Sequence, residues 1–476
     1  MSAETTAFLI VLVPVAGSFL VPLAALVSRK FRSFWAVLVG SVTAALPLTL
    51  IPVAVKGGEV VVRRSLVLGL DFVLVVDPLA IFMAIVSSFV GALIVIYSLG
   101  YVHHDDNQNE YYLMVLLFIG SMMGLVFSAN LVFMYLFWEV IAICCWRLIG
   151  FYREPEHVLK ADKAFLVTFF GAVIMLLGFI QVYGSTATFD LTQMRGTVIP
   201  GSAVLLILFG MFSKSATVPL HTWLPDAGVA PTTVTALLHA AVLVKIGVYA
   251  YARLFLYAFR LPEEWQQAIP VIVVVSSLVS AGAALVENDF KRILAYSTVS
   301  QIGYIFLGFS AATASGVSGS LLFILMHGLA KAGLFLCAGI VIHAVHTKDI
   351  REMGGLIRTM PVTAVAFLVC AFSVIGIPPF GGFFSKFLVI MGTVQAGHVW
   401  LAATALFTAV LTMFYLLRVF SLVFLGEPKH AAPERTKSMV YVVAVLAALS
   451  LAAGVFVSYP MKIVTTATAH ITGWLR

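Results

Sequence analysis

The sequence predicts an all-α, polytopic membrane protein with about 14 transmembrane helices. Hydrophobic residues fill 62% of its 476 positions and charged residues only 10%, whereas a soluble domain carries about a quarter charged residues. Apolar runs of about 20 residues, the length that a bilayer requires, recur along the chain. The alternating pattern of an outer-membrane barrel is absent, so helices are the expected spanning elements. This composition predicts contact with a lipid bilayer and excludes a soluble enzyme, a nucleic-acid-binding domain and an extracellular disulfide scaffold.

Proline, glycine and clusters of charge separate the apolar runs. We do not expect the first run to be a cleavable signal peptide, because Glu4 precedes it and a basic cluster at 29–32 follows it, the reverse of a signal's charge order. The expected segments are 7–28, 34–55, 73–100, 111–128, 131–151, 164–184, 202–219, 233–258, 268–287, 293–312, 317–345, 361–397, 400–425 and 439–460.

The loops between these segments carry unequal positive charge. With 14 segments, successive loops alternate between the two sides, and one side receives about twice as many lysines and arginines as the other. Positive charge marks the cytoplasmic side of a membrane protein. We therefore expect a location in the inner (cytoplasmic) cell membrane, with both termini facing outward.

Two segments carry signs of a broken helix, and they suggest an internal repeat. In the seventh, Pro219 follows Lys214 closely, and in the twelfth the sequence Gly-Ile-Pro-Pro-Phe-Gly-Gly occupies 376–382. The tripeptide Phe-Ser-Lys occurs in both, at 212–214 and 384–386. A five-segment repeat must invert its orientation, and inverted repeats with discontinuous helices mark the ion sites of transporters.

The repeat predicts four parts of the chain. Three helices precede the repeats, and a C-terminal helix follows them. The expected boundaries are 1–105, 106–260, 261–427 and 428–476.

Ionisable side chains inside apolar segments are the most informative feature of the sequence. A charge at the bilayer centre costs at least about 2.5–3.5 kcal/mol, so such groups must face each other, water or a counter-ion. Glu139 is the one acidic residue that we expect well within a segment, so most of the lysines must be hydrated or neutral. Groups of this kind can relay protons, and the candidates are Glu139, Lys214, His239, Lys245, His327, Lys331 and Lys386.

The spacing of two pairs supports a relay. His327 and Lys331 are four residues apart and share a helix face, and His239 and Lys245 lie within two turns of each other. His221, Asp226 and Asp289 are candidates for proton uptake or gating at the segment ends.

No cofactor or metal is expected. The cysteines at 144, 145, 337 and 370 lie in apolar segments and form no Cys-x-x-Cys motif, so a cluster or zinc site is not indicated. The sequence His-His-Asp-Asp at 103–106 is interpreted as a polar loop.

A long pattern resembles a known family. It includes Trp138-Glu139, Leu-Ile-Gly-Phe-Tyr at 148–152, Pro-Leu-His-Thr-Trp-Leu-Pro-Asp-Ala at 219–227, Asn-Asp-Phe-Lys-Arg at 288–292 and Gly-Phe-Phe-Ser-Lys at 382–386. Over about 77–424 the chain resembles the antiporter-like, proton-translocating membrane subunits of respiratory complex I, a family that includes membrane-bound hydrogenases and the large subunits of Mrp-type Na⁺/H⁺ antiporters.

The resemblance implies roles for the buried groups. In that family a glutamate on the fifth helix pairs with a lysine on the broken seventh, here Glu139 and Lys214. Further groups follow on the eighth, eleventh and broken twelfth helices along a hydrated axis at mid-membrane depth. These correspond to Lys245 with His239, His327 with Lys331, and Lys386.

Three departures leave the branch of the family open. The longest complex I relative ends in a lateral helix for which 476 residues leave no space, Arg147 stands where a neutral residue is expected, and the twelfth-helix charge is a lysine.

We expect a proton- or sodium-translocating subunit of a redox complex, a translocase part without its own redox centre. Its partners would be homologous antiporter-like subunits and a redox module. The alternatives are a Mrp-type Na⁺/H⁺ antiporter subunit and the membrane partner of an inorganic-carbon uptake system.

Overall fold

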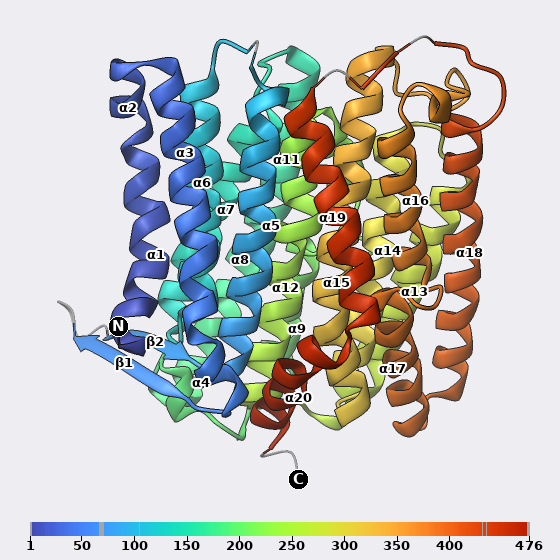
Figure 1. The fold of residues 1–476 in the computed structure, drawn as a ribbon. Coiled ribbons are helices and arrows are strands. Elements are labelled where there is room, and N and C mark those ends of the chain that lie inside the picture. Colours follow the sequence, from blue (N-terminus) through green and yellow to red (C-terminus); the bar gives the residue numbers. More distant parts are fainter. Residues whose placement is uncertain (1, 66–70, 104, 431, 435, 474–476) are drawn as a thin grey trace.

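The computed structural model is a bundle of nearly parallel helices with one short β-hairpin at its edge (Figure 1). It describes residues 2–65, 71–103, 105–430, 432–434 and 436–473. His104, part of the polar loop discussed above, lies outside these ranges. In the described part, eleven helices are long and apolar enough to cross a membrane, or twelve if one bent pair counts as a single span.

The N-terminal half contains the hairpin and the first spans. The bent pair is α1 with α2, which meet at 49°. The elements are α1 (Ala3–Phe19), α2 (Val21–Val27), α3 (Arg29–Ala45), η1 (Leu46–Leu50), α4 (Ile51–Val55), β1 (Val60–Ser65), β2 (Asp71–Val76), α5 (Pro78–Tyr101), α6 (Gln108–Phe127), α7 (Leu131–Ile149), α8 (Pro155–Thr186), η3 (Leu191–Gln193), β3 (Thr197–Val198), α9 (Gly201–Lys214), α10 (Trp223–Asp226) and η4 (Ala227–Val229).

The C-terminal half begins with an irregular span. Its segments η5 and η6 are π-helical. The elements are α11 (Thr232–Ala236), η5 (Leu237–Ala241), α12 (Leu243–Tyr251), η6 (Ala252–Ala258), β4 (Phe259–Arg260), α13 (Glu263–Val286), α14 (Phe290–Ser310), α15 (Ala314–Val345), η7 (Leu356–Arg358), α16 (Pro361–Ile375), α17 (Gly381–Gln395), α18 (Val399–Phe424), α19 (Lys437–Val455) and α20 (Ser458–Thr472).

The all-α class is confirmed, although the count of 14 is not. Each expected segment contains helix, but the seventh and twelfth are divided into the shorter helices α9, α16 and α17. The third was expected from residue 73, yet residues 71–76 form β2, paired antiparallel with β1. Residues 71–76 are rich in valine, a β-branched residue that favours a strand. Helix α5 begins only after Asp77, whose carboxylate accepts from the backbone N–H of Ala80 at 2.8 Å.

The two repeats are visible in the helix lengths and ends. Helices α8 and α15 each have 32 residues and end in a left-handed residue, Ala187 and His346. Isolated bridges join Asn130 to Asp190 and Asp289 to Asp349, in each case the residue before α7 or α14 and a residue beyond the following long helix. An interval of 159 residues therefore separates each of these features in the first repeat from its counterpart in the second.

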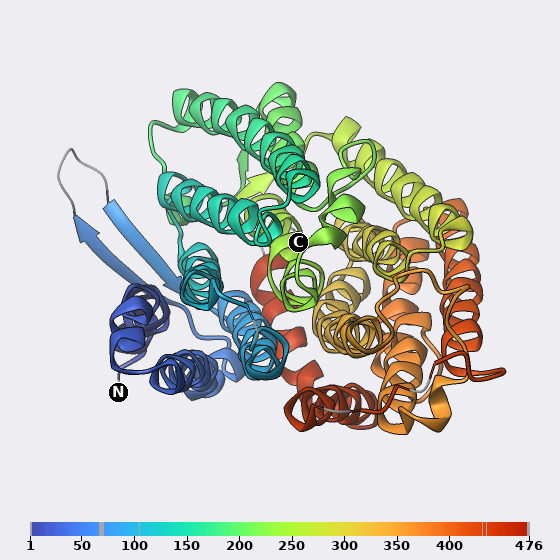
Figure 2. The same cartoon turned by 90° about the horizontal axis from the view of Figure 1, so that it is seen from above.

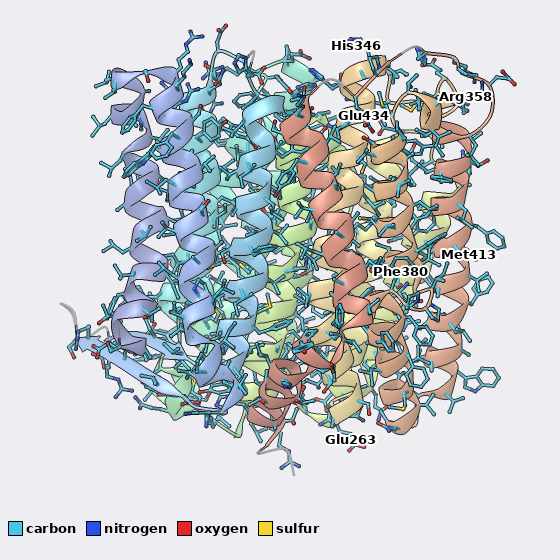
Figure 3. All side chains as sticks on the ribbon, in the orientation of Figure 1. Glu263, His346, Arg358, Phe380, Met413 and Glu434 are labelled. Carbon is cyan, nitrogen blue, oxygen red and sulfur yellow. The ribbon has the colours of Figure 1, made fainter. Side chains whose placement is uncertain are left out.

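The repeats run in opposite directions. Helix α15 ends at Val345, and its capping residue His346 lies at the end of the bundle opposite to Glu263 and to the hairpin (Figure 3). Helix α8 ends near Asp190, which pairs with Asn130 close to β2. The two long helices are thus antiparallel, as an inverted repeat requires.

The matching tripeptides do not occupy equivalent positions. Lys214 is the last residue of α9, before the break, whereas Lys386 lies within α17, after the break. The sequence match of Phe212–Lys214 with 384–386 was therefore wrong as an alignment of the repeats, because it places one lysine on each side of the two interruptions.

The middle of the bundle is formed by the irregular span 232–258 with α14 and α15, and α1, α3, α18 and α19 lie at its periphery (Figure 2). Helix α20, which the sequence did not predict, packs against α5, α15 and α4 at the end where α1 begins.

Candidate functional site

The seven buried candidates lie on six different elements around the centre of the bundle. Glu139 is on α7 and Lys214 on α9, His239 on η5 and Lys245 on α12, and Lys386 on α17, while α15 carries the remaining two. The six basic residues are at most 4% exposed, and Glu139 is half-buried. Lysine is almost never fully buried without a partner. The partners of these amines are therefore the central question of the site.

We refer to the seven candidates, taken in chain order, as the row, and Glu139 and Lys214 are its first two members. The ammonium of Lys214 lies 5.7 Å from the ring centroid of Trp138, the neighbour of Glu139. In the described part of the chain, the Lys214 amine and the Glu139 Oε1 each have no hydrogen-bond partner. The close pair that the family resemblance implies is not formed as a hydrogen-bonded ion pair in this state.

Lys245 approaches α15 at a glycine. A Cβ atom added to Gly328 would lie 3.2 Å from the Lys245 Nζ, so a larger residue at this position would press on the amine. The adjacent residue is His327, whose electrostatic neighbours are Lys245, Lys331, His239 and Lys386. The sequence analysis did not identify Gly328, and a glycine inside a long apolar helix gave no distinguishing pattern.

The two histidines are held by aromatic rings rather than by hydrogen bonds. His239 stacks on Phe335 with the ring centroids 4.4 Å apart, and His327 packs edge-on against Phe323 at 5.9 Å. None of their four ring nitrogens has a hydrogen-bond partner among the described residues. Packing against aromatic rings, rather than hydrogen bonds to described residues, therefore positions both imidazoles.

The last two lysines are partly satisfied by neutral oxygens. Lys331 donates to the carbonyl of Leu294 at 3.1 Å and to Ser297 Oγ at 2.7 Å, and Tyr415 also donates to Ser297 at 2.8 Å. Lys386 donates to the carbonyl of Ile375 at 3.3 Å.

The break in the twelfth span creates the acceptor for Lys386. Ile375 is the last residue of α16, and Gly376 follows it with φ +93°. The carbonyls of a final helical turn have no intrahelical partner and carry partial negative charge. The Lys386 ammonium also lies 4.6 Å from the ring centroid of Tyr304.

The outer candidates lie apart from this row. Asp226 accepts from Lys163 at 2.6 Å and from Arg292 at 2.7 Å. Burial raises the pKa of Asp226, but the two cations outweigh this effect and hold the pKa below its ordinary value. Asp289 caps α14 by accepting from the backbone N–H of Arg292. Burial lowers the pKa of His221, whose ring centroid lies 6.3 Å from that of Tyr296.

A second buried ionic cluster escaped the sequence analysis. Arg253 of η6 donates to both carboxylate oxygens of Asp77, at 2.5 and 2.9 Å, and neither side chain is more than 1% exposed. The His470 Nε2 of α20 lies 2.8 Å from the Glu59 Oε2, and the His470 Nδ1 lies 3.7 Å from the Asp77 Oδ2. Asp77 is a second buried acidic residue, but it lies at the start of α5 and not well within a span. Asp77 was within the expected third segment, and the sequence analysis did not single it out.

The same cluster contains residue types that can bind a metal ion, but its carboxylates already pair with arginines. Ligand atoms of Glu59, Asp77 and His470 lie within 4.8 Å of one another. However, Arg253 occupies both oxygens of Asp77, and Arg195 pairs with Glu59. Cations already compensate both carboxylates, so these residues fit an ionic latch for α20 better than a metal site.

Comparisons with known proteins agree on one family. A family model described as "NADH:quinone oxidoreductase/Mrp antiporter, TM" matches residues 128–412, and one described as "NADH-Ubiquinone oxidoreductase (complex I), chain 5 N-terminus" matches residues 66–112. NAD(P)H-quinone oxidoreductase chain 5 of Picosynechococcus sp. is 38% identical over 74% of this chain and 56% of its own length. Na(+)/H(+) antiporter subunit A1 of Staphylococcus haemolyticus is 31% identical over 97% of this chain and 62% of its own.

The fold also matches a solved structure. A chain in the structure of the Mrp complex from Dietzia sp. superimposes with a TM-score of 0.91 at 24% identity, covering 99% of this chain and 98% of that one. The chain spans little more than half the length of the curated relatives above.

Proposed function

Because the chain belongs to the family of NADH:quinone oxidoreductase and Mrp antiporter membrane subunits, we propose that it moves protons across the cell membrane within a multisubunit complex. The observation that carries the proposal is the row of buried amines and imidazoles with no carboxylate partner within 4 Å among the described residues. Amines and imidazoles bind and release protons, whereas their positive charge repels Na⁺. The row therefore favours protons over sodium ions.

Polar atoms without protein partners supply the route. Buried polar groups are normally hydrogen-bonded, and water takes the place of a missing protein partner. Unpartnered atoms occur on Glu139, Lys214, Lys245, His239 and His327, on elements from α7 to α15. We propose that water joins these groups to Lys331 and Lys386 as one proton axis.

The Glu139–Lys214 pair is proposed as the switch of this axis. When Glu139 approaches Lys214, the carboxylate stabilises the ammonium and the proton is held. When the pair separates, as in the present structure, the buried ammonium loses that stabilisation and releases its proton towards Lys245. A change of charge next to Glu139 in a neighbouring subunit would move the pair between these states.

The boundaries 1–105, 106–260, 261–427 and 428–476 are proposed as functional parts. The two repeats would each supply half of the proton axis, with Asp226, His221 and Asp289 near the mouth at the end of the bundle where α14 begins. The unequal loop charge supports an orientation with both termini outside.

The complex is proposed to be a redox complex, with partner subunits that supply the redox centre. The greater identity to the quinone oxidoreductase chain supports this choice. A Mrp-type antiporter is the second candidate, favoured by the match to subunit A1 over 97% of the chain. Purification in mild detergent separates them: a redox module should accompany the first, and only other membrane subunits the second. A soluble zinc protein would instead support inorganic-carbon uptake.

Substitution of the switch tests the proton axis itself. In the assembled complex, Lys214→Ala and Glu139→Ala should each abolish proton pumping or uncouple it from electron transfer, because the axis loses its controlled donor. Lys462→Ala, which removes an exposed lysine of α20, is the matched control. An unchanged proton-to-electron ratio in Lys214→Ala would refute the proposal.

A further inference from the structure

A cavity of about 420 Å³ lies among the first turns of α3, the end of α5 and the start of α6. The first turns of α3, which line it, are at the end of the bundle opposite to the β-hairpin, where α1 and α3 form the periphery (Figures 1 and 2). The lining residues are Arg29, Lys30, Arg32, Ser33, Phe34, Val37, Leu99, His103, Gln108 and Tyr112.

The wall of this cavity contains a buried arginine without a carboxylate. Arg32 is 5% exposed, and among the described residues its guanidinium donates only to neutral groups: Asn109 at 2.9 Å, Ser33 at 3.3 Å and the Gln108 side chain. Its Nε is buried and has no partner in the described part of the chain. No carboxylate of a described residue lies within 4 Å of it.

The other buried arginine shows how unusual this is. Arg253 is 1% exposed and meets both oxygens of Asp77. A buried charge that lacks a counter-ion is strongly destabilising. The environment of Arg32 is therefore incomplete unless an anion approaches it.

Two further cations stand at the mouth of the cavity. Arg29 and Lys30 are exposed and begin α3, whose first turn contains no acidic residue. The N-terminus of a helix already carries partial positive charge, so cations there are unfavourable and anions favourable. The three basic residues at the start of α3 are therefore in an electrostatically unfavourable position, and a bound anion would compensate their charge.

Apolar side chains continue below the cations. Phe34 and Val37 follow one and two turns farther along α3, and Leu99 of α5 faces the same cavity. Phe34 is 59% exposed. Charge at the mouth above an apolar wall matches a phosphate headgroup joined to an acyl chain better than it matches a free anion.

We propose that this cavity binds the phosphate headgroup of an anionic phospholipid. The headgroup lies against Arg29 and Lys30 within the field of Arg32, and an acyl chain follows Phe34 and Val37. Juxtamembrane cations each contribute to binding anionic lipid, and basic pockets between spans bind such headgroups. The proposal does not depend on the transported ion or on the type of complex.

The test is lipid retention by the purified full chain with its accompanying subunits, measured by native mass spectrometry with added phosphatidylglycerol. Arg29→Gln with Lys30→Gln should weaken retention about 30-fold, because two cations are lost. Lys348→Gln with Arg358→Gln is the matched control: these are two exposed cations at the same end of the bundle, with Arg358 far from α3 (Figure 3). The control should retain lipid as the unaltered protein does.

Three further results decide the interpretation. Phosphatidylcholine should not displace phosphatidylglycerol, and millimolar inorganic phosphate should not either. Equal retention in both double variants, or equal binding of phosphatidylcholine, would overturn the proposal. Displacement by inorganic phosphate would assign the cavity to a free anion and also overturn it. Unchanged thermal unfolding of both variants in lipid-free detergent would show that folding does not cause the difference.

Discussion

Two regions of this molecule bury charge in opposite ways. At the end near the hairpin, Arg253 and Asp77 form a two-point ion pair that excludes solvent. In the centre, Lys214 and Lys245 are equally buried but have no hydrogen-bond partner among the described residues. A charge with a fixed partner holds elements in place, whereas a charge without one can be changed by a proton. The contrast distinguishes the part of the fold that a fixed ion pair stabilises from the part in which we propose that protons move.

The largest effect should follow from breaking the fixed pair. Arg253→Met should lower the free energy of unfolding by about 3–5 kcal/mol, because it leaves the buried Asp77 carboxylate without its two-point cationic partner. The midpoint of thermal unfolding in lipid nanodiscs measures this loss. Adding Asp77→Asn should restore much of the stability, since asparagine can still cap α5. A double variant no more stable than Arg253→Met alone would contradict the explanation.

The opposite behaviour is expected in the centre. Lys245→Met removes a buried amine that has no hydrogen-bond partner in the described part of the chain, so stability should change by less than about 1 kcal/mol or increase. Proton translocation in proteoliposomes, followed with a pH-sensitive dye, should nevertheless fall at least about tenfold. A variant that conducts normally would remove Lys245 from the axis. One that unfolds like Arg253→Met would show that the amine is structural.

The smallest effect concerns Asp226, which is partly exposed and paired. Its pKa is held below the ordinary value by Lys163 and Arg292. The pair therefore stabilises the fold above the unfolded pKa of about 4, and this contribution disappears as the pH falls through the folded pKa.

Asp226→Asn should accordingly cost about 1 kcal/mol at neutral pH and nothing in acid. Thermal unfolding curves between pH 3 and 7 would show the two proteins converging as the pH falls. Glu263→Gln, an exposed carboxylate on α13, is the control. A difference that persists in acid would mean that Asp226 acts through packing and not through its charge.

The positions of the buried groups could be predicted because each is a local property. A lysine within a run of apolar residues is visible without any tertiary information, and so are the interruptions after Lys214 and at 376–382. The repeat was inferred from a tripeptide match that does not align the two repeats. Equivalent helices start 159 residues apart, as α7 does at Leu131 and α14 at Phe290. When the two repeats are aligned with this interval, their sequences share almost no identical residues.

Partners could not be predicted, because they come from distant parts of the chain. Asp77 and Arg253 are 176 residues apart in sequence. The π-helical segments around His239 and Arg253 have no distinct composition. They depend on how the eighth span packs inside the bundle.

The sequence by itself determined the membrane class, the approximate spans and the identity of the amines in their interiors, because hydropathy and charge act at the scale of a single helix. Only the tertiary structure decided which charges have partners. It gives Arg253 a carboxylate, leaves Lys245 beside Gly328, and surrounds Arg32 with neutral acceptors. Electrostatic interactions depend on distance in space, and that distance is set by helix packing rather than by separation along the chain.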